Sequence, residues 1–260
     1  MDLGLKGRKA IVCASSRGLG NACALALARE GCEVVINGLD PDRLKAASAE
    51  IAAATGAKVT CVRADITTEE GRRALVAACP DADILVNNNA GPKPAKLEDL
   101  NHEDFLAALE MNMLAPILLI KLVLPGMRKR KFGRIVNITS ALVKSSRAPD
   151  MGLSTSARTG LTAMCKSLSR EVAADNVTLN NILPERIDTD RQRFMAERIM
   201  KSENVTMAEA RERIASTLPA KRFGRTEEFG DACAFLCSVN AGFITGQNLQ
   251  LDGGSYQGLV

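Results

Sequence analysis

Short apolar runs alternate with longer amphipathic stretches along the whole chain. The runs are rich in Val and Ile and lack a strict apolar–polar alternation, a pattern typical of parallel strands buried on both faces of a sheet. Seven runs predict strands, over Ala10–Cys13, Glu33–Asn37, Lys58–Arg63, Ile84–Asn87, Arg134–Thr139, Thr178–Leu183 and Asn248–Leu251.

Stretches with helical periodicity separate these runs. They predict helices over Gly20–Glu30, Pro41–Thr55, Thr67–Ala78, Asn101–Arg130, Ser154–Asp175 and Glu227–Ser238. The alternation predicts an α/β fold with a single doubly wound parallel sheet, Rossmann-like, of seven strands with helices on both faces. Because no linker, repeat or low-complexity tract interrupts the pattern, residues 1–260 are expected to form one dinucleotide-binding domain.

One segment, residues 188–225, breaks the alternation. Its pattern is helical and heavily charged, and Thr206-Met-Ala-Glu209 fits a capping box. The segment follows the carboxyl end of a strand, where ligands bind in such sheets. It is therefore expected to be a helical insertion, either a lid over a substrate or a solvated excursion of the surface.

The turn between the first strand and the first helix carries the first candidate chemistry. Residues Cys13–Gly20 read Cys-Ala-Ser-Ser-Arg-Gly-Leu-Gly. Such a turn exposes backbone N–H groups beside the positive end of a helix, which suits a pyrophosphate. The candidate dinucleotide-binding residues are Ser16, Arg17, Gly18, Leu19 and Gly20.

Composition narrows the classes of protein and partner. Of 260 residues, 46% are hydrophobic and 3% aromatic, with one Tyr and no Trp, so Ala, Leu, Val and Ile must fill the core. The net charge of +4 is too small to indicate a nucleic-acid partner. No apolar stretch reaches membrane-spanning length, and the N-terminus lacks the pattern of a signal peptide. We expect a cytoplasmic protein without a membrane partner.

The residue types that bind transition metals, Cys and His, give no sign of a metal site. Most of the eight Cys fall inside predicted strands or helices, and the single histidine, His102, stands at a predicted helix start. The sequence therefore predicts no metal site, reduced thiols in the core, and a surface position for His102.

Further sequence features occur in order along the chain: Asp65, Asn87–Gly91, Asn112, Ile135–Ser140, Pro184–Thr189, Phe243–Gln247 and Leu251–Gly254. With the glycine-rich turn, they resemble the short-chain dehydrogenase/reductase family, especially the branch that contains 3-oxoacyl-carrier-protein reductases. The resemblance covers the whole chain. It implies an NAD(P)(H)-binding oxidoreductase that acts on a small molecule with a carbonyl, alcohol or similarly activated group.

The resemblance favours NADP over NAD as the cofactor. The family's turn reads Thr-Gly-x-x-x-Gly-x-Gly; Gly18 and Gly20 match, and Ala14 stands at the first Gly, where its methyl is tolerated if φ stays negative. An Arg at the position of Arg17 often holds the 2′-phosphate of NADP in this family. The acid that binds the ribose of NAD is replaced by Gly38.

The resemblance also assigns the rest of the cofactor. It implies that Asp65 and Ile66 contact the adenine. It implies that Asn88, Asn89 and Ala90 line the ribose. The nicotinamide is expected to contact Pro184, Ile187 and Thr189. The Asn-rich turn has one Asn more than the family's Asn-Asn-Ala-Gly, so the frames Asn87–Ala90 and Asn88–Gly91 both stay open. Glu185 replaces a family Gly beside the negatively charged cofactor.

The family's chemistry rests on an Asn, a Ser and a Tyr-x-x-x-Lys pair. Asn112 and Ser140 match the first two residues, but Ser154 and Arg158 stand at the Tyr and the Lys. Arg158 is also expected to hold the cofactor ribose. A Ser hydroxyl is a far weaker acid than a phenol of pKa about 10, and a guanidinium stays charged and cannot relay a proton.

This departure leaves three functions open. The first is a reductase whose acid comes from elsewhere, namely Asp150, Lys144, or a water held by Ser140 and Ser154. The second is a catalytically silent cofactor-binding protein. The third is a non-redox lyase or isomerase that uses the same pocket.

Two features bear on partners. In the family, the helices that match Asn101–Arg130 and Ser154–Asp175 pair across two-fold axes, which implies a homotetramer or homodimer. The basic cluster Arg128–Lys131 with Arg134 suits either an acidic acyl carrier protein or a solvated helix end.

Overall fold

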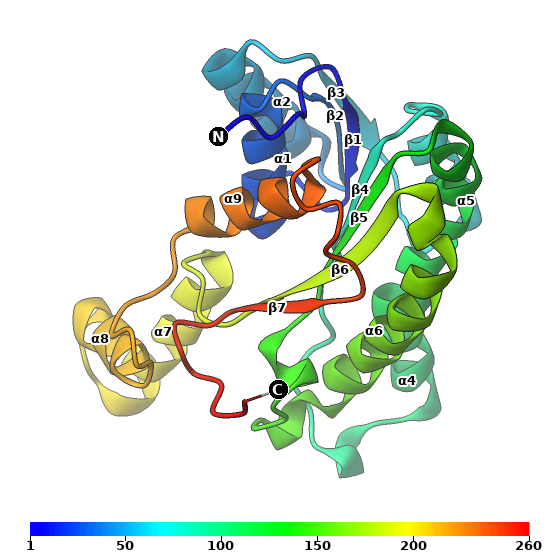
Figure 1. The fold of residues 1–260 in the computed structure, drawn as a ribbon. Helices are drawn as coiled ribbons and strands as arrows, with labels where there is room; N and C mark the ends of the chain where they lie inside the picture. The colour runs from blue at the N-terminus through cyan, green and yellow to red at the C-terminus, as the bar shows by residue number, and fades with distance from the viewer. Residues whose placement is uncertain (260) are drawn as a thin grey trace.

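A single parallel sheet forms the centre of the protein. The structure, a computed structural model, describes residues 1–259, and the strand order is β3-β2-β1-β4-β5-β6-β7 (Figure 1). The strands are β1 Lys9–Val12, β2 Glu33–Gly38, β3 Val59–Arg63, β4 Ile84–Asn87, β5 Gly133–Ile138, β6 Val177–Pro184 and β7 Asn248–Leu251. The predicted fold class is confirmed, with strand ends displaced by one residue in several places.

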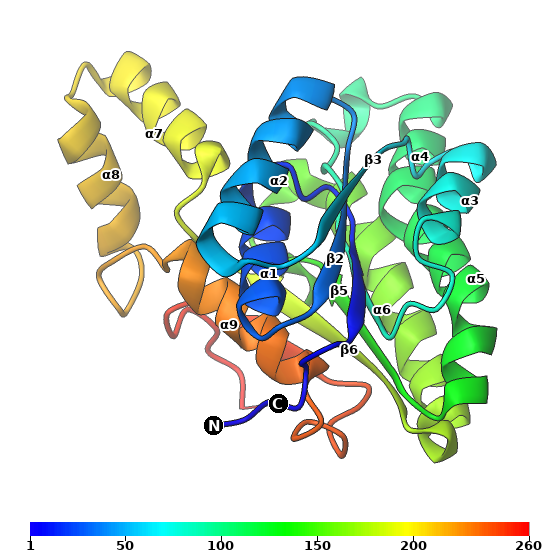
Figure 2. The same cartoon turned by 90° about the horizontal axis from the view of Figure 1, so that it is seen from above.

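Helices cover both faces of the sheet, as Figure 2 shows. The helices are α1 Gly18–Arg29, α2 Pro41–Thr55, α3 Glu69–Ala77, α4 His102–Leu109, α5 Ala115–Arg130, α6 Gly152–Val172, α7 Asp190–Glu203, α8 Met207–Ser216 and α9 Thr226–Cys237. Helices α1, α2 and α9 contribute to the core on one face, and α3, α5 and α6 to the core on the other.

Strands β1 to β6 contribute side chains to both cores, which explains their apolar runs. Ala10 and Val12 of β1 belong to the cluster under α1 and α9, whereas Ile11 between them belongs to the cluster under α5 and α6. All three side chains are fully buried. Successive side chains point to opposite faces of a strand, so a strand covered on both sides favours apolar residues at consecutive positions.

The helix predicted over Asn101–Arg130 is interrupted. Asn101 caps α4, and a π-helical turn, Glu110–Leu114, separates α4 from α5. A π turn has one residue more per hydrogen-bonded ring than an α-helix, and such turns are frequent at functional sites. It carries Asn112, which was expected inside a regular helix.

The same helical segment corrects the expectation about membrane-spanning length. By length and composition alone, the run His102–Arg130 could cross a membrane. In the fold, its α5 part packs one side on the sheet, where Leu119, Val123 and Met127 are buried.

The insertion at residues 188–225 consists of α7 and α8 and protrudes from the edge of the sheet (Figure 1). It has its own small apolar cluster, built around Ala196, Ala210 and Ile214. The predicted capping box is present, because Thr206 accepts from the backbone of Glu209 and the Glu209 carboxylate accepts from the backbone of Thr206.

Candidate active site

The glycine-rich turn joins β1 to the N-terminus of α1. A Cβ on Gly20 would lie 2.4 Å from the carbonyl oxygen of Ala14, so only glycine fits there. The first turn of α1 has no side-chain cap and no acidic residue. Its backbone N–H groups are therefore available to an anion, and the positive end of the helix dipole adds to the attraction.

Ala14 differs from the expectation, because its φ is +45° rather than negative. This left-handed conformation is unfavourable for a residue with a Cβ. Hydrogen bonds hold it in place: the Ala14 N–H donates to Asn37 Oδ1 at 3.3 Å, and Asn88 Nδ2 donates to the Ala14 carbonyl at 3.2 Å. The turn is thus fixed from β2 and from the loop after β4.

Arg17 lies at the N-terminus of α1, and its guanidinium pairs with Asp190 of α7 at 3.1 Å. Both side chains are more than half exposed. Near the end of β2, Arg63 Nε donates to the carbonyl oxygen of Leu39 at 3.1 Å. Sequence reasoning missed this second cation; the signal was a basic residue at the end of the strand that pairs with β2.

The loops after β3 and β4 hold the residues expected around the cofactor's adenosine. Asp65 Oδ1 accepts from the N–H and the hydroxyl of Thr67, while Ile66 is buried. Strand β4 ends at Asn87, so Asn88 and Asn89 belong to the loop. Asn89 Nδ2 donates to the carbonyl of Met111 at 3.2 Å, which ties this loop to the π turn.

A row of asparagines, not foreseen from the sequence, crosses the buried sheet. The side chains of Asn87, Asn137, Asn181 and Asn248 stand at matching positions of β4 to β7. Each Nδ2 donates to the next Oδ1, at 2.9, 2.9 and 2.8 Å. Every amide in the row is thus oriented, and Asn87 Oδ1, at the site end, has no partner within residues 1–259.

Three of the expected catalytic residues, Asn112, Ser154 and Arg158, lie beside the loop that follows β4. Asn112 Nδ2 donates to the carbonyl of Ala90 at 2.8 Å, and the guanidinium of Arg158 donates to the hydroxyl of the buried Ser154. A Cβ on Gly91 would lie 3.3 Å from Arg158 Nη1. A small cavity beside them is lined by Ile66, Asn87, Asn88, Asn89, Asn112 and Arg158, among others.

Ser140 stands directly after β5 and caps a short 3-10 turn. Its Oγ accepts from the Leu142 N–H at 3.2 Å, so the hydroxyl proton is left for another acceptor. The side chain is partly exposed, unlike that of Ser154.

Arg158 is a cation that is largely removed from water. Burial, and to a lesser degree the charge of Arg191, lower the pKa of its guanidinium to about 10. No carboxylate of the described chain forms an ion pair with it. At neutral pH the group is still charged, so the site holds an uncompensated positive charge beside the Ser154 hydroxyl.

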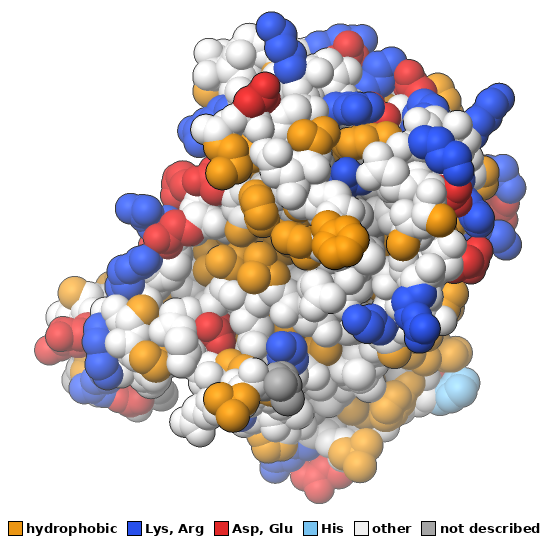
Figure 3. Space-filling view, in the orientation of Figure 1, with side chains coloured by type: hydrophobic (Ala, Val, Ile, Leu, Met, Phe, Trp, Pro, Cys, Tyr) orange, Lys and Arg blue, Asp and Glu red, His pale blue; other side chains and the backbone are white. Residues whose placement is uncertain are grey.

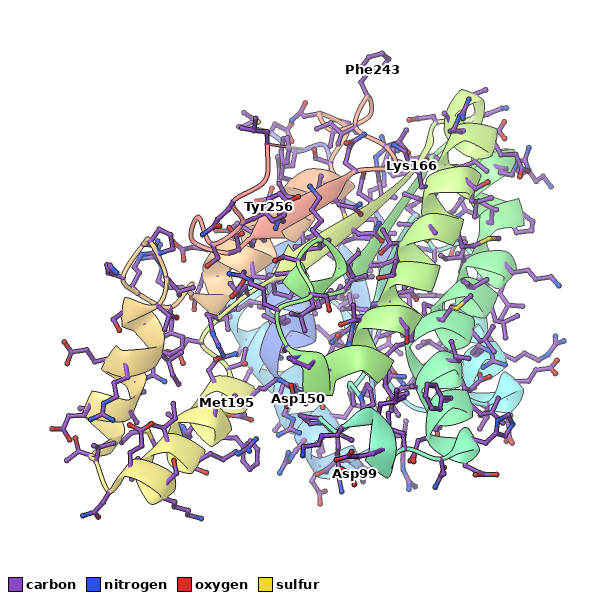
Figure 4. All side chains as sticks on the ribbon, turned by 90° about the horizontal axis from the view of Figure 1, so that it is seen from below. Asp99, Asp150, Lys166, Met195, Phe243 and Tyr256 are labelled. Atoms are coloured by element: carbon purple, nitrogen blue, oxygen red, sulfur yellow. The ribbon has the colours of Figure 1, made fainter. Side chains whose placement is uncertain are left out.

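The other acids considered from the sequence come from separate elements; of the residues discussed here, Figure 4 labels Asp150 and Tyr256. Asp150 is exposed in the 3-10 turn before α6, and its backbone carbonyl accepts from Ala95. Lys144 lies over the ring of Tyr256, with Nζ 5.3 Å from the ring centroid. The chain's single Tyr is thus brought from the C-terminal tail to the loop that follows Ser140.

The segment after β6 runs from the sheet into the insertion. Pro184 is the last residue of β6, Ile187 is buried, and Thr189 begins α7 as its N-cap. Glu185, expected to be unfavourable beside a negatively charged cofactor, pairs with Arg147 at 2.9 Å. That pair joins the loop after β5 to the segment after β6 and neutralises the carboxylate.

The basic cluster lies at the surface except for one buried member, and most of its members form ion pairs within the chain. Arg134 is buried, which corrects its expected place in a surface cluster. Arg128 and Lys131 both pair with Asp175. His102 is exposed at the start of α4, as expected.

The cysteines are free thiols, and seven of the eight are buried; Cys61 on β3 is exposed, contrary to the expectation of a core position. Within residues 1–259, no three His, Cys, Asp or Glu side chains are grouped as they would be around a metal ion.

Comparison with known proteins gives matches over almost the whole chain. The sequence model of a family described as enoyl-(acyl carrier protein) reductase matches residues 13–256. The NADPH-dependent reductase BacG of Bacillus subtilis (strain 168) is 34% identical over 257 residues, which cover 97% of this chain and 99% of BacG. The 3-oxoacyl-[acyl-carrier-protein] reductase FabG of Aquifex aeolicus (strain VF5) is 31% identical over 260 residues, with 98% and 100% covered.

Solved structures agree with these matches. The structure of YwfH, an NADPH-dependent reductase involved in bacilysin biosynthesis, is similar with a TM-score of 0.90 and 33% identity, covering 98% of this chain and 100% of that one. L-Sorbose reductase from Gluconobacter frateurii, complexed with NADPH and L-sorbose, gives a TM-score of 0.95 at 30% identity, with both chains fully covered.

Proposed function

The chain belongs to the short-chain dehydrogenase/reductase family, and we propose that it is an NADP(H)-dependent reductase of a small molecule with an activated carbonyl group. The observation that carries this proposal is the connection between the uncapped N-terminus of α1 and the catalytic cluster. The loop after β4 contacts both: Asn88 donates to Ala14 of the turn, and Ala90 accepts from Asn112. One bound dinucleotide would then extend from the turn to the cluster.

Several features support the fit of NADP(H) to this edge of the sheet. The free N–H groups of α1 would hold the pyrophosphate, and the loop from Asn88 to Ala90 would line a ribose. Gly38 leaves no acid opposite a 2′-phosphate, and Arg17 and Arg63 supply cations near that point. BacG is an NADPH-dependent reductase, and L-sorbose reductase was solved with NADPH. When bound, the reduced nicotinamide supplies a hydride.

Arg17 is expected to select NADPH over NADH. A guanidinium holds a phosphate through two charge-assisted hydrogen bonds, worth about 1.5–3 kcal/mol. Arg17→Ala should therefore weaken NADPH binding by roughly 10- to 100-fold and leave NADH nearly unchanged, as measured by titration of nicotinamide fluorescence. The control is Arg29→Ala, an exposed Arg at the other end of α1. Equal losses for both cofactors would refute the assignment.

The insertion is proposed to act as a lid. Asp190 of α7 pairs with Arg17, and Asp188 forms a two-pronged pair with Arg211 of α8, at 3.0 and 2.7 Å. The first pair joins the insertion to the cofactor turn. A 2′-phosphate on Arg17 would compete with Asp190, so cofactor binding and the position of α7 would be coupled.

Ser154 and Arg158 stand where the family has its Tyr and Lys. Their role decides whether the protein is a working reductase or a catalytically silent cofactor-binding protein. If Ser154 takes part in turnover, Ser154→Ala should lower kcat by at least about 100-fold while NADPH binding survives. In a silent protein the parent would show no turnover on any carbonyl, and Ser154→Tyr with Arg158→Lys would create it, because a phenol beside an ammonium can be poised near neutral pH. A screen of carbonyls and alcohols with both cofactors separates the two cases.

A homotetramer or homodimer is the expected assembly. On α4, the π turn and α6, the side chains of Phe105, Leu106, Leu114 and Met164 are exposed; around α9 and β7, so are those of Phe235, Val239, Phe243 and Leu249. Figure 3 shows apolar side chains gathered on the face that carries α9 and β7. Exposed apolar patches mark association surfaces. Light scattering at micromolar concentration should give two or four times the chain mass; a monomer mass would contradict the assignment.

A further inference from the structure

The segment that leads from β6 into α7 contains three carboxylates, and each of them pairs with an arginine from another part of the chain. The pairs are Glu185 with Arg147, Asp188 with Arg211, and Asp190 with Arg17. The carboxylates of the segment are thus engaged, and within residues 1–259 none of them forms an ion pair with an arginine of the segment itself.

Arg191 of α7 and Arg158 of α6 are two like charges that act on each other. The charge of Arg191 adds to burial in lowering the pKa of the Arg158 guanidinium to about 10. In the part of the chain that the structure describes, no carboxylate forms an ion pair with either group. Like charges repel each other more strongly where one of them is removed from water. An anion bound to both groups would replace this repulsion by attraction.

The position of Arg191 in its helix also favours an anion. Arg191 is the second residue of α7, whose N-cap, Thr189, makes no side-chain hydrogen bond to the helix. The first turn of a helix attracts negative charge, so a cation there is unfavourable unless an anion accompanies it. Arg186 adds a third guanidinium: it donates to Gln192 of the same turn, and its buried Nε has no acceptor within residues 1–259.

The small cavity beside Arg158 is suited to hydroxyl groups rather than to an anion. Asn87 and Asn112 line it together with Arg158, and the buried Oδ1 atoms of both have no donor within residues 1–259. Carbonyl oxygens repel an anion and accept hydrogen bonds from hydroxyls, so this cavity fits the cofactor ribose. Arg191 does not line the cavity and therefore approaches Arg158 from another direction.

The anionic groups of the cofactor have places of their own. The turn before α1 would hold the pyrophosphate, and Arg17 the 2′-phosphate. Asp190 contacts Arg17, whereas Arg191, the next side chain, points about 100° away around the helix. The charge of Arg191 is thus left for a second anion.

Phe194 adds an apolar surface next to Arg191. It follows Arg191 by three positions, so the two side chains lie on one side of α7. Its side chain is 58% exposed and is not a member of the apolar cluster around Ala196. A molecule with an anionic end and an apolar body would contact both side chains.

Resting on the proposed reductase function, we propose that the substrate carries a carboxylate or phosphate group on an apolar body, and that Arg158 and Arg191 bind this anion together. Each guanidinium has donors to spare, since a guanidinium carries five N–H groups. Arg158 belongs to the body of the protein and Arg191 to the insertion, so the same anion would tie the insertion to the site.

The first test needs no turnover. Benzoate, phenyl phosphate and benzamide are titrated calorimetrically into the NADP-saturated protein. We expect at least one of the two anions to bind at least about 10-fold more tightly than neutral benzamide, and the tighter of the two identifies the group. Arg191→Gln should weaken that anion by roughly 10- to 100-fold, the effect of losing a charge-assisted hydrogen bond, and leave benzamide unchanged.

Arg193→Gln is the matched control. Arg193 is exposed on the same helix, but two positions from Arg191, so it lies on a different side. It should leave the affinity for all three molecules unchanged. Anions that bind no better than benzamide, or anion binding that survives Arg191→Gln, would overturn the proposal. So would a loss of NADPH affinity in Arg191→Gln without a loss for the anions, because Arg191 would then belong to the cofactor site.

The second test uses turnover with NADPH. A series of aromatic keto acids of increasing chain length is compared with the corresponding methyl esters. We expect kcat/KM for the preferred acid to exceed that for its ester by at least about 10-fold, and Arg191→Gln to remove the difference through KM. Equal turnover of acids and esters would overturn the anion proposal and leave the reductase function intact. Anion binding that depends on Arg191, without turnover of any carbonyl, would contradict the reductase function and support the anion site.

Discussion

Replacing Gly20 by alanine is expected to lower the affinity for NADPH by about 100-fold, which corresponds to roughly 2.8 kcal/mol. The new Cβ would lie 2.4 Å from the carbonyl oxygen of Ala14 and 3.0 Å from Asn88 Nδ2. The first neighbour is backbone and cannot turn aside, so either the turn or α1 must move. The N–H groups that would hold the pyrophosphate move with it, and a displacement of about 1 Å costs on the order of 100-fold.

Isothermal titration with NADPH measures this loss, and thermal unfolding shows how much of the variant is folded. Gly152→Ala is the matched control, because a Cβ on Gly152 meets nothing within 4 Å. It should bind NADPH as the parent does. If Gly20→Ala binds NADPH normally, the turn is not where the dinucleotide binds, even though the family relationship stands.

The pattern of apolar runs was sufficient to predict the sheet, because burial on both faces favours apolar residues at consecutive strand positions. The alternation of strands and helices then leaves few ways to connect them. The helix over Asn101–Arg130 was predicted as one piece because a π turn preserves the apolar face on either side of it. Nothing in the local pattern marks the extra residue at Asn112.

The environment of the candidate site was harder to predict than its residues. Ser154 and Arg158 could be aligned with the family pair, but their mutual hydrogen bond and the missing carboxylate depend on side chains from several elements. Glu185 shows the same difficulty: alone it opposes an anionic cofactor, and only the fold brings Arg147 to it. The asparagine row likewise needs the register of four strands. Long-range pairings of this kind leave no trace in spacing along one chain.

Arg134 lies inside the fold although its position in the sequence places it in a basic run. Replacing it by methionine is expected to destabilise the protein by about 3 kcal/mol, because buried carbonyls lose their donor. In the sequence it extends a basic run; in the fold it is 1% exposed. Its guanidinium donates to the carbonyls of Ser238, Gly133 and Asn176, at 2.8 to 3.0 Å, and lies 4.3 Å from the ring centroid of Phe132.

Methionine fills the space of the Arg134 stem but donates no hydrogen bond. The carbonyls of Ser238 and Gly133 would lose the guanidinium as a donor, whereas the carbonyl of Asn176 would keep the backbone N–H of Gly133 at 3.1 Å. A buried carbonyl that is left without a donor costs about 1–3 kcal/mol before any water enters. The loop after α9 and the end of α6 would lose their common anchor. Urea unfolding measures the loss in the midpoint. Lys129→Met, in the same basic run but exposed at the end of α5, should change stability by less than about 0.5 kcal/mol. Equal midpoints for the two variants would mean that Arg134 is no more structural than its neighbours, and the basic run would again qualify as a binding surface.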